Sequence, residues 1–315
     1  MSLVAWIRRD CAAAAAIAAP APLTAAASWA ALVLGALGTA FAPVFVRFAD
    51  VGPVASGFWR QALATVALLP WLAWDRSPQA AATAANGAGW FGVTALAGIA
   101  FAVDVAAYHS AIGLTSVVNA TFLLNLAPVF VALGAWLLFA EKLRPAFLVA
   151  LAVASIGVAL LTLGRASPGG HAFTGDALGL IAGVAYAAYL LAVSRLRRSV
   201  STARVMLWST AFAAPPLLVL ALALGETVVP RSAGGWSAVL GLALVVHCAG
   251  QSLIAYALAH IPASISAVGV LLAPVFAALL GWTIFAEALT GPQALGCITI
   301  LVAVYLARQS NAAIG

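Results

Sequence analysis

The chain has 315 residues, of which 65% are hydrophobic and 7% are charged, and its formal net charge is +6. Because a water-soluble domain carries about 25% charged residues, this composition excludes a soluble globule and favours a chain that lies mostly in lipid. The basic residues stand between apolar runs and form no aromatic-interleaved basic face, which argues against nucleic-acid binding. The cysteines Cys11, Cys248 and Cys297 have no spacing typical of a disulfide framework or a metal site.

The first 24 residues precede the apolar runs and contain Arg8–Arg9 followed by an alanine-rich stretch. A cleaved signal peptide is one interpretation of this segment. Alanine makes a poor apolar core for a signal peptide, and the first span can act as an uncleaved signal-anchor. We therefore expect residues 1–24 to be a retained cytoplasmic extension.

Ten apolar runs of about 18–25 residues follow, each bounded by polar residues or by Pro and Gly. Backbone groups in hydrocarbon must be hydrogen-bonded within their own segment, so each run is predicted to be a helix. The fold class predicted is therefore an all-α integral membrane protein with ten transmembrane helices. The predicted spans are 25–48, 53–74, 88–112, 116–138, 145–164, 176–195, 203–224, 236–259, 263–285 and 291–308.

The distribution of Lys and Arg over the connections predicts the orientation. With a cytoplasmic N-terminus, ten of these residues lie on the cytoplasmic side and three on the opposite side. The densest group is Arg195, Arg197, Arg198 and Arg204, between the sixth and seventh spans. We expect a multi-pass protein of the cytoplasmic (inner) membrane with both termini in the cytoplasm.

The chain contains an internal repeat. Residues 126–143 (LAPVFVALGAWLLFAEKL) and 272–289 (LAPVFAALLGWTIFAEAL) match at 12 of 18 positions without a gap, at an offset of 146. This offset predicts a duplication. It divides the chain into a first repeat (25–165), a linker (166–174), a second repeat (175–308) and a tail (309–315). Because each repeat holds five spans, an odd number, the two repeats have opposite orientations in the membrane.

Inverted repeats are typical of secondary transporters, in which exchange of the two conformations moves a central cavity from one side to the other. The paired LAPVF segments, the FAE that follows each one, and Phe58–Trp59–Arg60 resemble the EamA-type branch of the drug/metabolite transporter superfamily. The resemblance implies two inverted five-helix repeats around a central cavity, lined mainly by helices one, three, four, six, eight and nine. It also implies transport of small metabolites, often efflux, with amino-acid exporters among its members. The alanine-rich N-terminal extension departs from that pattern.

Two pairs of equivalent residues are candidates for gating. Pro128 and Pro274 lie inside their helices, where proline removes a backbone hydrogen bond, so each marks either a hinge or a static kink. Glu141 and Glu287 end the fourth and ninth spans at opposite membrane faces. They either latch each face in turn or simply lie among the lipid headgroups.

Arg60 and Asp104 are the charged residues most clearly inside spans, each roughly 10–12 Å deep at 1.5 Å per residue. Charges at this depth must pair or face water. We expect an intramembrane ion pair between them. The alternative for Asp104 is proton coupling or binding of a substrate ammonium.

Other polar residues of the spans are expected to line a cavity for a mostly apolar metabolite with one or two polar groups. Each of them has the alternative of a simple helix–helix contact. With Asp104, the predicted substrate-binding residues are Tyr108, His109, Asn119, Asn125, Tyr186, Tyr189, His247 and Gln251.

The predicted function is secondary transport of a small metabolite by alternating access, with export of amino acids or related compounds favoured. The alternatives are uptake, flipping of a sugar-nucleotide or lipid-linked substrate and, more distantly, a non-transport membrane protein. We predict no catalytic residues, no metal and no cofactor, because HExxH, GxSxG and paired intramembrane aspartates are absent. Proton coupling through Asp104, His109 or His247 stays open. The expected partners are a small-molecule substrate and the lipid bilayer, without nucleic acid, and the carrier is expected to work as a monomer.

Overall fold

The computed structural model describes residues 25–76, 89–115, 117–162, 172–286 and 288–312, and all regular structure in these ranges is helical. The predicted all-α class is thus confirmed. Within the described residues, nine helical segments are long and apolar enough to cross a membrane. The 22-residue helix α4 (Pro53–Trp74) completes the set of ten spans.

The first repeat comprises five spans. The first is α2 (Ala25–Ala40) with α3 (Ala42–Phe48), and the second is α4. The third is α6 (Gly89–Leu114), the fourth is α7 (Val117–Leu124) with α8 (Ala127–Phe139), and the fifth is α9 (Pro145–Thr162).

The second repeat has the same order. It consists of α10 (Ala172–Leu196), α11 (Thr202–Ala223), a span made of α12 (Ala233–Gly241), the π-helix η2 (Leu242–Gln251) and α13 (Ser252–Ala257), a span made of α14 (Ala263–Val270) and α15 (Leu272–Phe285), and α16 (Gly291–Ala312). The sixth span begins at Ala172 and not at 176. Asp176 lies inside it and accepts a hydrogen bond of 2.7 Å from the Thr115 hydroxyl, so the carboxylate does not mark the helix end.

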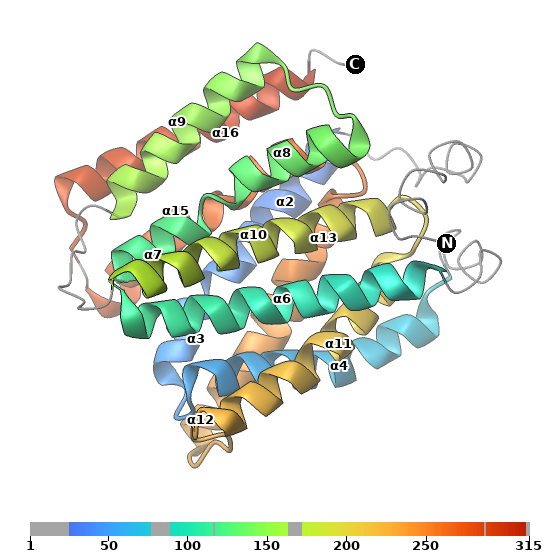
Figure 1. The fold of residues 1–315 in the computed structure, drawn as a ribbon, viewed down its shortest axis with the longest axis vertical. Helices are drawn as coiled ribbons and strands as arrows, with labels where there is room; N and C mark the ends of the chain where they lie inside the picture. The colour runs from blue at the N-terminus through green and yellow to red at the C-terminus, as the bar shows by residue number, and fades with distance from the viewer. Residues whose placement is uncertain (1–24, 77–88, 116, 163–171, 287, 313–315) are drawn as a thin grey trace.

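The contacts between helices repeat with inverted symmetry. α6 packs against α10, and its counterpart η2–α13 packs against α2. α7 and α8 contact α10, while α14 and α15 contact α2. In two further contacts, equivalent spans of the two repeats pack against each other: α4 against α11, and α9 against α16. These two pairs lie at opposite edges of the bundle (Figure 1). The packing therefore follows the duplication read from the sequence.

Three spans are broken inside the membrane at prolines. α7 ends at Leu124 and α8 begins at Ala127, with Pro128 in its first turn. α14 ends at Val270 and α15 begins at Leu272, two residues before Pro274. The first span breaks at Phe41, next to Pro43 in α3. Proline cannot donate to the carbonyl four residues earlier, so the carbonyls of Leu124 and Val270 lack their helical donor.

The two FAE motifs end their helices in the same way. Ala140 and Ala286 both have φ of 53°, the left-handed conformation that commonly stops a helix. The N–H of Glu141 donates to the Ala135 carbonyl at 3.1 Å across this stop. The repeated sequence therefore encodes a repeated backbone turn.

Glycines allow the closest helix contacts. A Cβ on Gly183 of α10 would lie 2.7 Å from the Leu123 carbonyl at the end of α7. A Cβ on Gly38 of α2 would lie 2.8 Å from the Cα of Gly250 in η2. These two contacts hold the broken span and the π-helix against their neighbours.

Hydrogen bonds join the connections at the end of the bundle where α3 and α12 meet. Glu226 accepts hydrogen bonds from the backbone N–H groups of Val54 (3.3 Å) and Ala55 (2.8 Å) at the start of α4. Asp50 accepts from the N–H groups of Arg231 (3.0 Å) and Ser232 (2.8 Å). The loop before α4 is thus tied to the loop before α12, which belongs to the other repeat.

A buried arginine reinforces the opposite end. The Nε of Arg197 donates to the Ala255 carbonyl at 3.3 Å, and its Nη1 donates to the Val200 carbonyl. Burial lowers the pKa of Arg197 to about 10, so the guanidinium stays charged at neutral pH. It links the end of α10 to α13.

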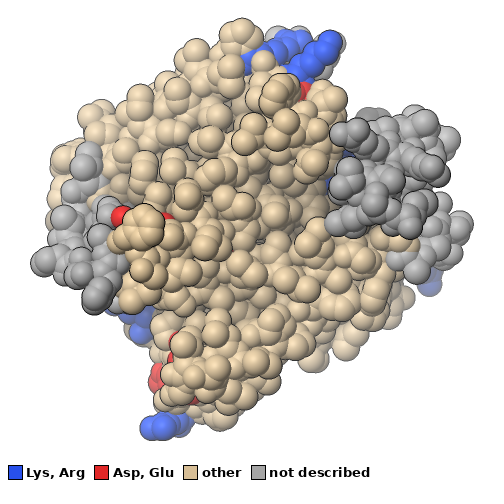
Figure 2. Space-filling view, in the orientation of Figure 1, with Lys and Arg blue, Asp and Glu red and all other residues tan. Residues whose placement is uncertain are grey.

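The charged side chains visible on one face of the molecule lie near its margins. The face in Figure 2 is almost entirely uncharged, with Lys, Arg, Asp and Glu near its edges. Large apolar side chains such as Val66, Leu137, Val149 and Ile156 are exposed on the helices between these edges. An uncharged belt of this kind suits contact with lipid, and the chain is a multi-pass membrane protein.

Candidate functional site

A cavity of about 180 Å³ lies inside the bundle where α7 gives way to α8 and α14 to α15. At about 30 Å³ per water molecule it has room for about six waters. Both repeats contribute to its wall at positions related by the offset of 146. These pairs are Leu124 and Val270, Asn125 and Leu271, Ala127 and Ala273, and Pro128 and Pro274. The cavity therefore lies at the junction between the inverted halves.

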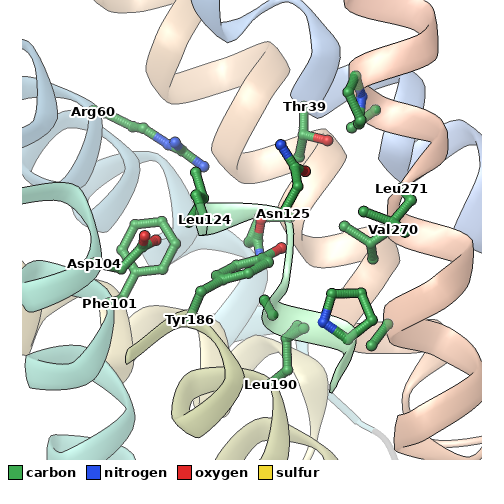
Figure 3. A pocket seen from close by; sticks show the side chains of 16 residues that line it. Thr39, Arg60, Phe101, Asp104, Leu124, Asn125, Tyr186, Leu190, Val270 and Leu271 are labelled. Carbon is green, nitrogen blue, oxygen red and sulfur yellow. The ribbon is translucent and has the colours of Figure 1, made fainter. Parts of the chain in front are cut away.

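One wall of the cavity is charged and comes from the first repeat. Arg60 projects from α4, while Phe101 and Asp104 project from α6, one turn apart on the same face. The guanidinium carbon of Arg60 lies 5.1 Å from the centroid of the Phe101 ring, a cation–π contact. Figure 3 shows Arg60 and Asp104 on this side, with Tyr186 of α10, from the second repeat, beside them.

The expected ion pair between Arg60 and Asp104 is not formed as a direct contact. Within the described parts of the chain, no carboxylate oxygen lies within 4.0 Å of the Arg60 guanidinium. The buried Nε of Arg60 has no hydrogen-bond partner there. The reason is that the guanidinium lies over the Phe101 ring, so the two charges share a wall without touching.

The opposite wall is apolar. Val270 and Leu271 lie across the cavity from Arg60 and Asp104 (Figure 3). Ala267, from the same helix as Val270, also lines the cavity. Asn125 holds the position equivalent to Leu271, so one polar group replaces an apolar one at the symmetric site. The cavity is thus polar on one side and apolar on the other.

Four of the predicted substrate-binding residues line this cavity: Asp104, Asn125, Tyr186 and Gln251. The Gln251 side chain lies beside the phenols of Tyr186 and Tyr189. Its amide nitrogen is buried without a hydrogen-bond partner among the described residues. The Asn125 amide donates to the Thr121 carbonyl at 2.8 Å, which orients it at the helix break.

Two more predicted residues form a layer behind the cavity wall. The ring of Tyr189 is 4.9 Å from that of Phe101, and the His247 ring is 5.7 Å from Phe101. His247 Nε2 is 2.8 Å from the Thr210 hydroxyl, and both groups are buried. Tyr189 and His247 therefore support Phe101 and do not line the cavity.

Of the remaining predicted residues, Tyr108 and His109 are not among those that line the cavity. Tyr108 forms a hydrogen bond of 3.0 Å with Thr121 of α7, and the His109 side chain lies beside the backbone of Pro53. Asn119 lies in α7, and its side chain is outside what the structure describes. Their roles in binding stay predictions.

The gating candidates lie in different places. Pro128 and Pro274 line the cavity at the two helix breaks. Glu141 accepts a hydrogen bond from Ser264 at the start of α14. Glu287 falls outside the described residues.

Several wall residues were missed by the sequence reasoning: Thr39, Phe101 and the apolar wall. Signals in the sequence point to Phe101 and to the apolar wall, but not to Thr39. Phe101 is one turn from Asp104, and the offset of 146 carries Asn125 onto Leu271 of the apolar wall. No group of three or more His, Cys, Asp or Glu side chains that could hold a metal ion occurs in the described ranges.

Comparison with known proteins gives three results. The model of the EamA-like transporter family matches residues 25–163 and 173–309, one match for each repeat. An "Uncharacterized transporter" of Archaeoglobus fulgidus is 28% identical over 205 residues, which is 65% of this chain and 72% of that protein. A solved crystal structure of a protein superposes with a TM-score of 0.73 and 19% sequence identity, over 92% of this chain and 99% of the other.

Proposed function

Since this chain belongs to the EamA-like transporter family, we propose that it exports amino acids or related small metabolites by alternating access. One observation carries the mechanism. The cavity is lined by equivalent residues of two inverted repeats, at the breaks of two helices. Exchange of the two conformations between the repeats would open this cavity to one side and then to the other.

The two broken spans are the moving elements of this proposal. α7–α8 and α14–α15 each contain a proline and a carbonyl without its helical donor, and residues at both breaks line the cavity. Half-helices joined at such breaks can tilt without rupture of a continuous hydrogen-bond ladder. Pro128 and Pro274 thus serve as hinges, and Glu141 and Glu287 as latches at the two faces.

The cytoplasmic membrane, with both termini inside, is the proposed location. The excess of Lys and Arg at the connections expected inside supports it, with Arg197 and Arg198 at the end of α10. Cysteines placed singly at Ser199 and at Val229 would test the orientation. A membrane-impermeant maleimide added to intact cells should label Val229→Cys and spare Ser199→Cys, and the reverse would refute it.

Transport itself is tested in proteoliposomes with a panel of amino acids, with and without a pH gradient. Uptake or counterflow of an amino acid above protein-free liposomes is expected. If Asp104 carries a coupled proton, the gradient stimulates wild-type transport and has no effect on Asp104→Asn. If no amino acid of the panel is transported but a nucleotide sugar is, the substrate proposal is wrong.

A sugar-nucleotide carrier is the main rival. Two or more cations would be needed for a diphosphate. Among the described residues that line the cavity, Arg60 is the single Lys or Arg. The presence of one such cation favours a substrate with one anionic group. The cavity is lined by residues of a single chain, which is consistent with a monomeric carrier.

A further inference from the structure

The charged wall of the cavity combines three features. Arg60 and Asp104 carry opposite charges, both face the same small cavity, and they are not joined by a direct ion pair. Asp104 is 8% exposed and, within the chain that the structure describes, its carboxylate accepts no hydrogen bond from a side chain or backbone group.

A cation and an anion so deep in a membrane protein are costly unless each has a partner or faces water. Phe101 supplies the Arg60 guanidinium with a π-face and leaves its N–H donors without a carboxylate. Two unmatched charges on one wall are complementary to a ligand that carries both opposite charges on a short skeleton.

The rest of the cavity limits the ligand further. Val270 and Leu271, on the wall that faces the two charges, carry no polar group. The cavity volume of about 180 Å³ admits a solute of the size of valine, whereas the larger tryptophan would extend beyond it.

We propose that Arg60 binds the carboxylate and Asp104 the ammonium of one compact zwitterion, whose small apolar side chain lies against Val270 and Leu271. This assignment rests on the proposed transport function and specifies its substrate class. The Tyr186 phenol and the Gln251 amide, both from residues on the cavity wall, supply further hydrogen bonds to the ligand. Phe101 holds the two charges apart, so that the ligand does not compete with an existing ion pair.

Binding to the purified full-length chain in lipid nanodiscs tests the assignment, by isothermal titration calorimetry with four probes. The probes are L-valine, isobutylamine (valine without its carboxylate), 3-methylbutanoate (valine without its ammonium) and L-tryptophan. Valine should bind, and each of the other three should bind at least about tenfold more weakly. A charge-assisted hydrogen bond corresponds to about ten- to hundredfold in affinity.

Two variants assign the charges. In Arg60→Gln, valine should bind no better than isobutylamine, because the partner of the carboxylate is gone. In Asp104→Asn, valine should bind no better than 3-methylbutanoate. Arg60→Lys keeps the charge without the planar fork and should recover part of the affinity. Arg231→Gln removes a cation from a loop far from the cavity and should leave valine binding unchanged.

Failure of the assignment is distinguishable from failure of the proposed function. If isobutylamine or 3-methylbutanoate binds wild type as tightly as valine, or if both charge variants fold and keep the wild-type affinity, the zwitterion assignment is wrong. If the proteoliposomes of the transport test then move a solute that lacks one of the two charges, the transporter function is still supported. Folding of each variant is checked by its thermal unfolding and its elution as a single species.

Discussion

The Glu141 carboxylate accepts a hydrogen bond from the Ser264 hydroxyl, which joins the end of α8 in the first repeat to the start of α14 in the second. Both helices continue into the breaks that line the cavity. The bond therefore closes the bundle at the end toward which α8 runs, the proposed cytoplasmic face.

Removal of this bond should favour opening at that face. Ser264→Ala deletes the donor and leaves a carboxylate without its partner, at a cost of about 1.5–3 kcal/mol, or about tenfold or more in the ratio of closed to open states. Spin labels at Lys142 and Ala259 should report longer distances in the variant. Ser237→Ala is the matched control, because that hydroxyl bonds only within α12. Equal distance distributions in Ser264→Ala and wild type would rule out a latch.

The helix breaks should be needed for turnover. Pro128→Ala gives the Leu124 carbonyl a helical donor again, and Pro274→Ala does the same for Val270. If the restored hydrogen bond stabilises one conformation by about 1.4 kcal/mol, the barrier to leaving that conformation rises by the same amount and transport slows about tenfold. Pro70→Ala provides the control, because Pro70 is an exposed proline inside α4 and away from the cavity. Static kinks would predict unchanged rates in proteoliposomes for both cavity variants.

Gly183 should be intolerant of any side chain. The new methyl of Gly183→Ala would lie 2.7 Å from the Leu123 carbonyl and 3.3 Å from that of Leu124, so α7 or α10 must shift. We expect a loss of about 1–3 kcal/mol, seen as a lower Tm. Gly92→Ala on α6 meets nothing within 4 Å and should be neutral or stabilising. Similar Tm values for the two variants would show that the close contact is unimportant.

Asp50 should contribute stability that depends on pH. Partial desolvation raises the pKa of this carboxyl, but hydrogen bonds from Ser232 and Arg231 outweigh it, and the net pKa lies below 3.8. Because the folded-state pKa is lowered, the contribution is present above about pH 4 and is lost as the pH falls through the lowered pKa. Asp50→Asn should therefore have a lower Tm than wild type at pH 7, and the difference should shrink in acid. A difference independent of pH would refute a role for the charge.

Much of the fold follows from the sequence because lipid imposes a simple rule. Each apolar run must satisfy its own backbone, so length and hydropathy predict the ten spans. The 146-residue offset predicts the inverted packing, since similar segments bury similar surfaces. The paired left-handed stops at Ala140 and Ala286 show that this identity extends to backbone angles.

The arrangement of the cavity was harder to predict. The depth of a residue in the membrane can be counted along its helix, and this count predicts similar depths for Arg60 and Asp104. Contact between them depends on the rotation of α4 against α6, and here the Arg60 guanidinium carbon lies 5.1 Å from the centroid of the Phe101 ring. Rotation likewise turns Tyr189 and His247 behind the wall, while Tyr186 and Gln251 face the cavity.

The π-helix η2 has no counterpart in α6, although the two belong to equivalent spans. A π-helix has more residues per turn than an α-helix, so side chains along η2 point in different directions from those along α6. The two repeats therefore share a topology but differ in local helix geometry. In the proposed alternating access, the inward-facing and outward-facing forms are therefore not equivalent under the twofold symmetry of the repeats, and their energies differ even without a ligand. The resting orientation of the proposed carrier is then a property of the chain itself, and it determines which side of the membrane meets the empty cavity first.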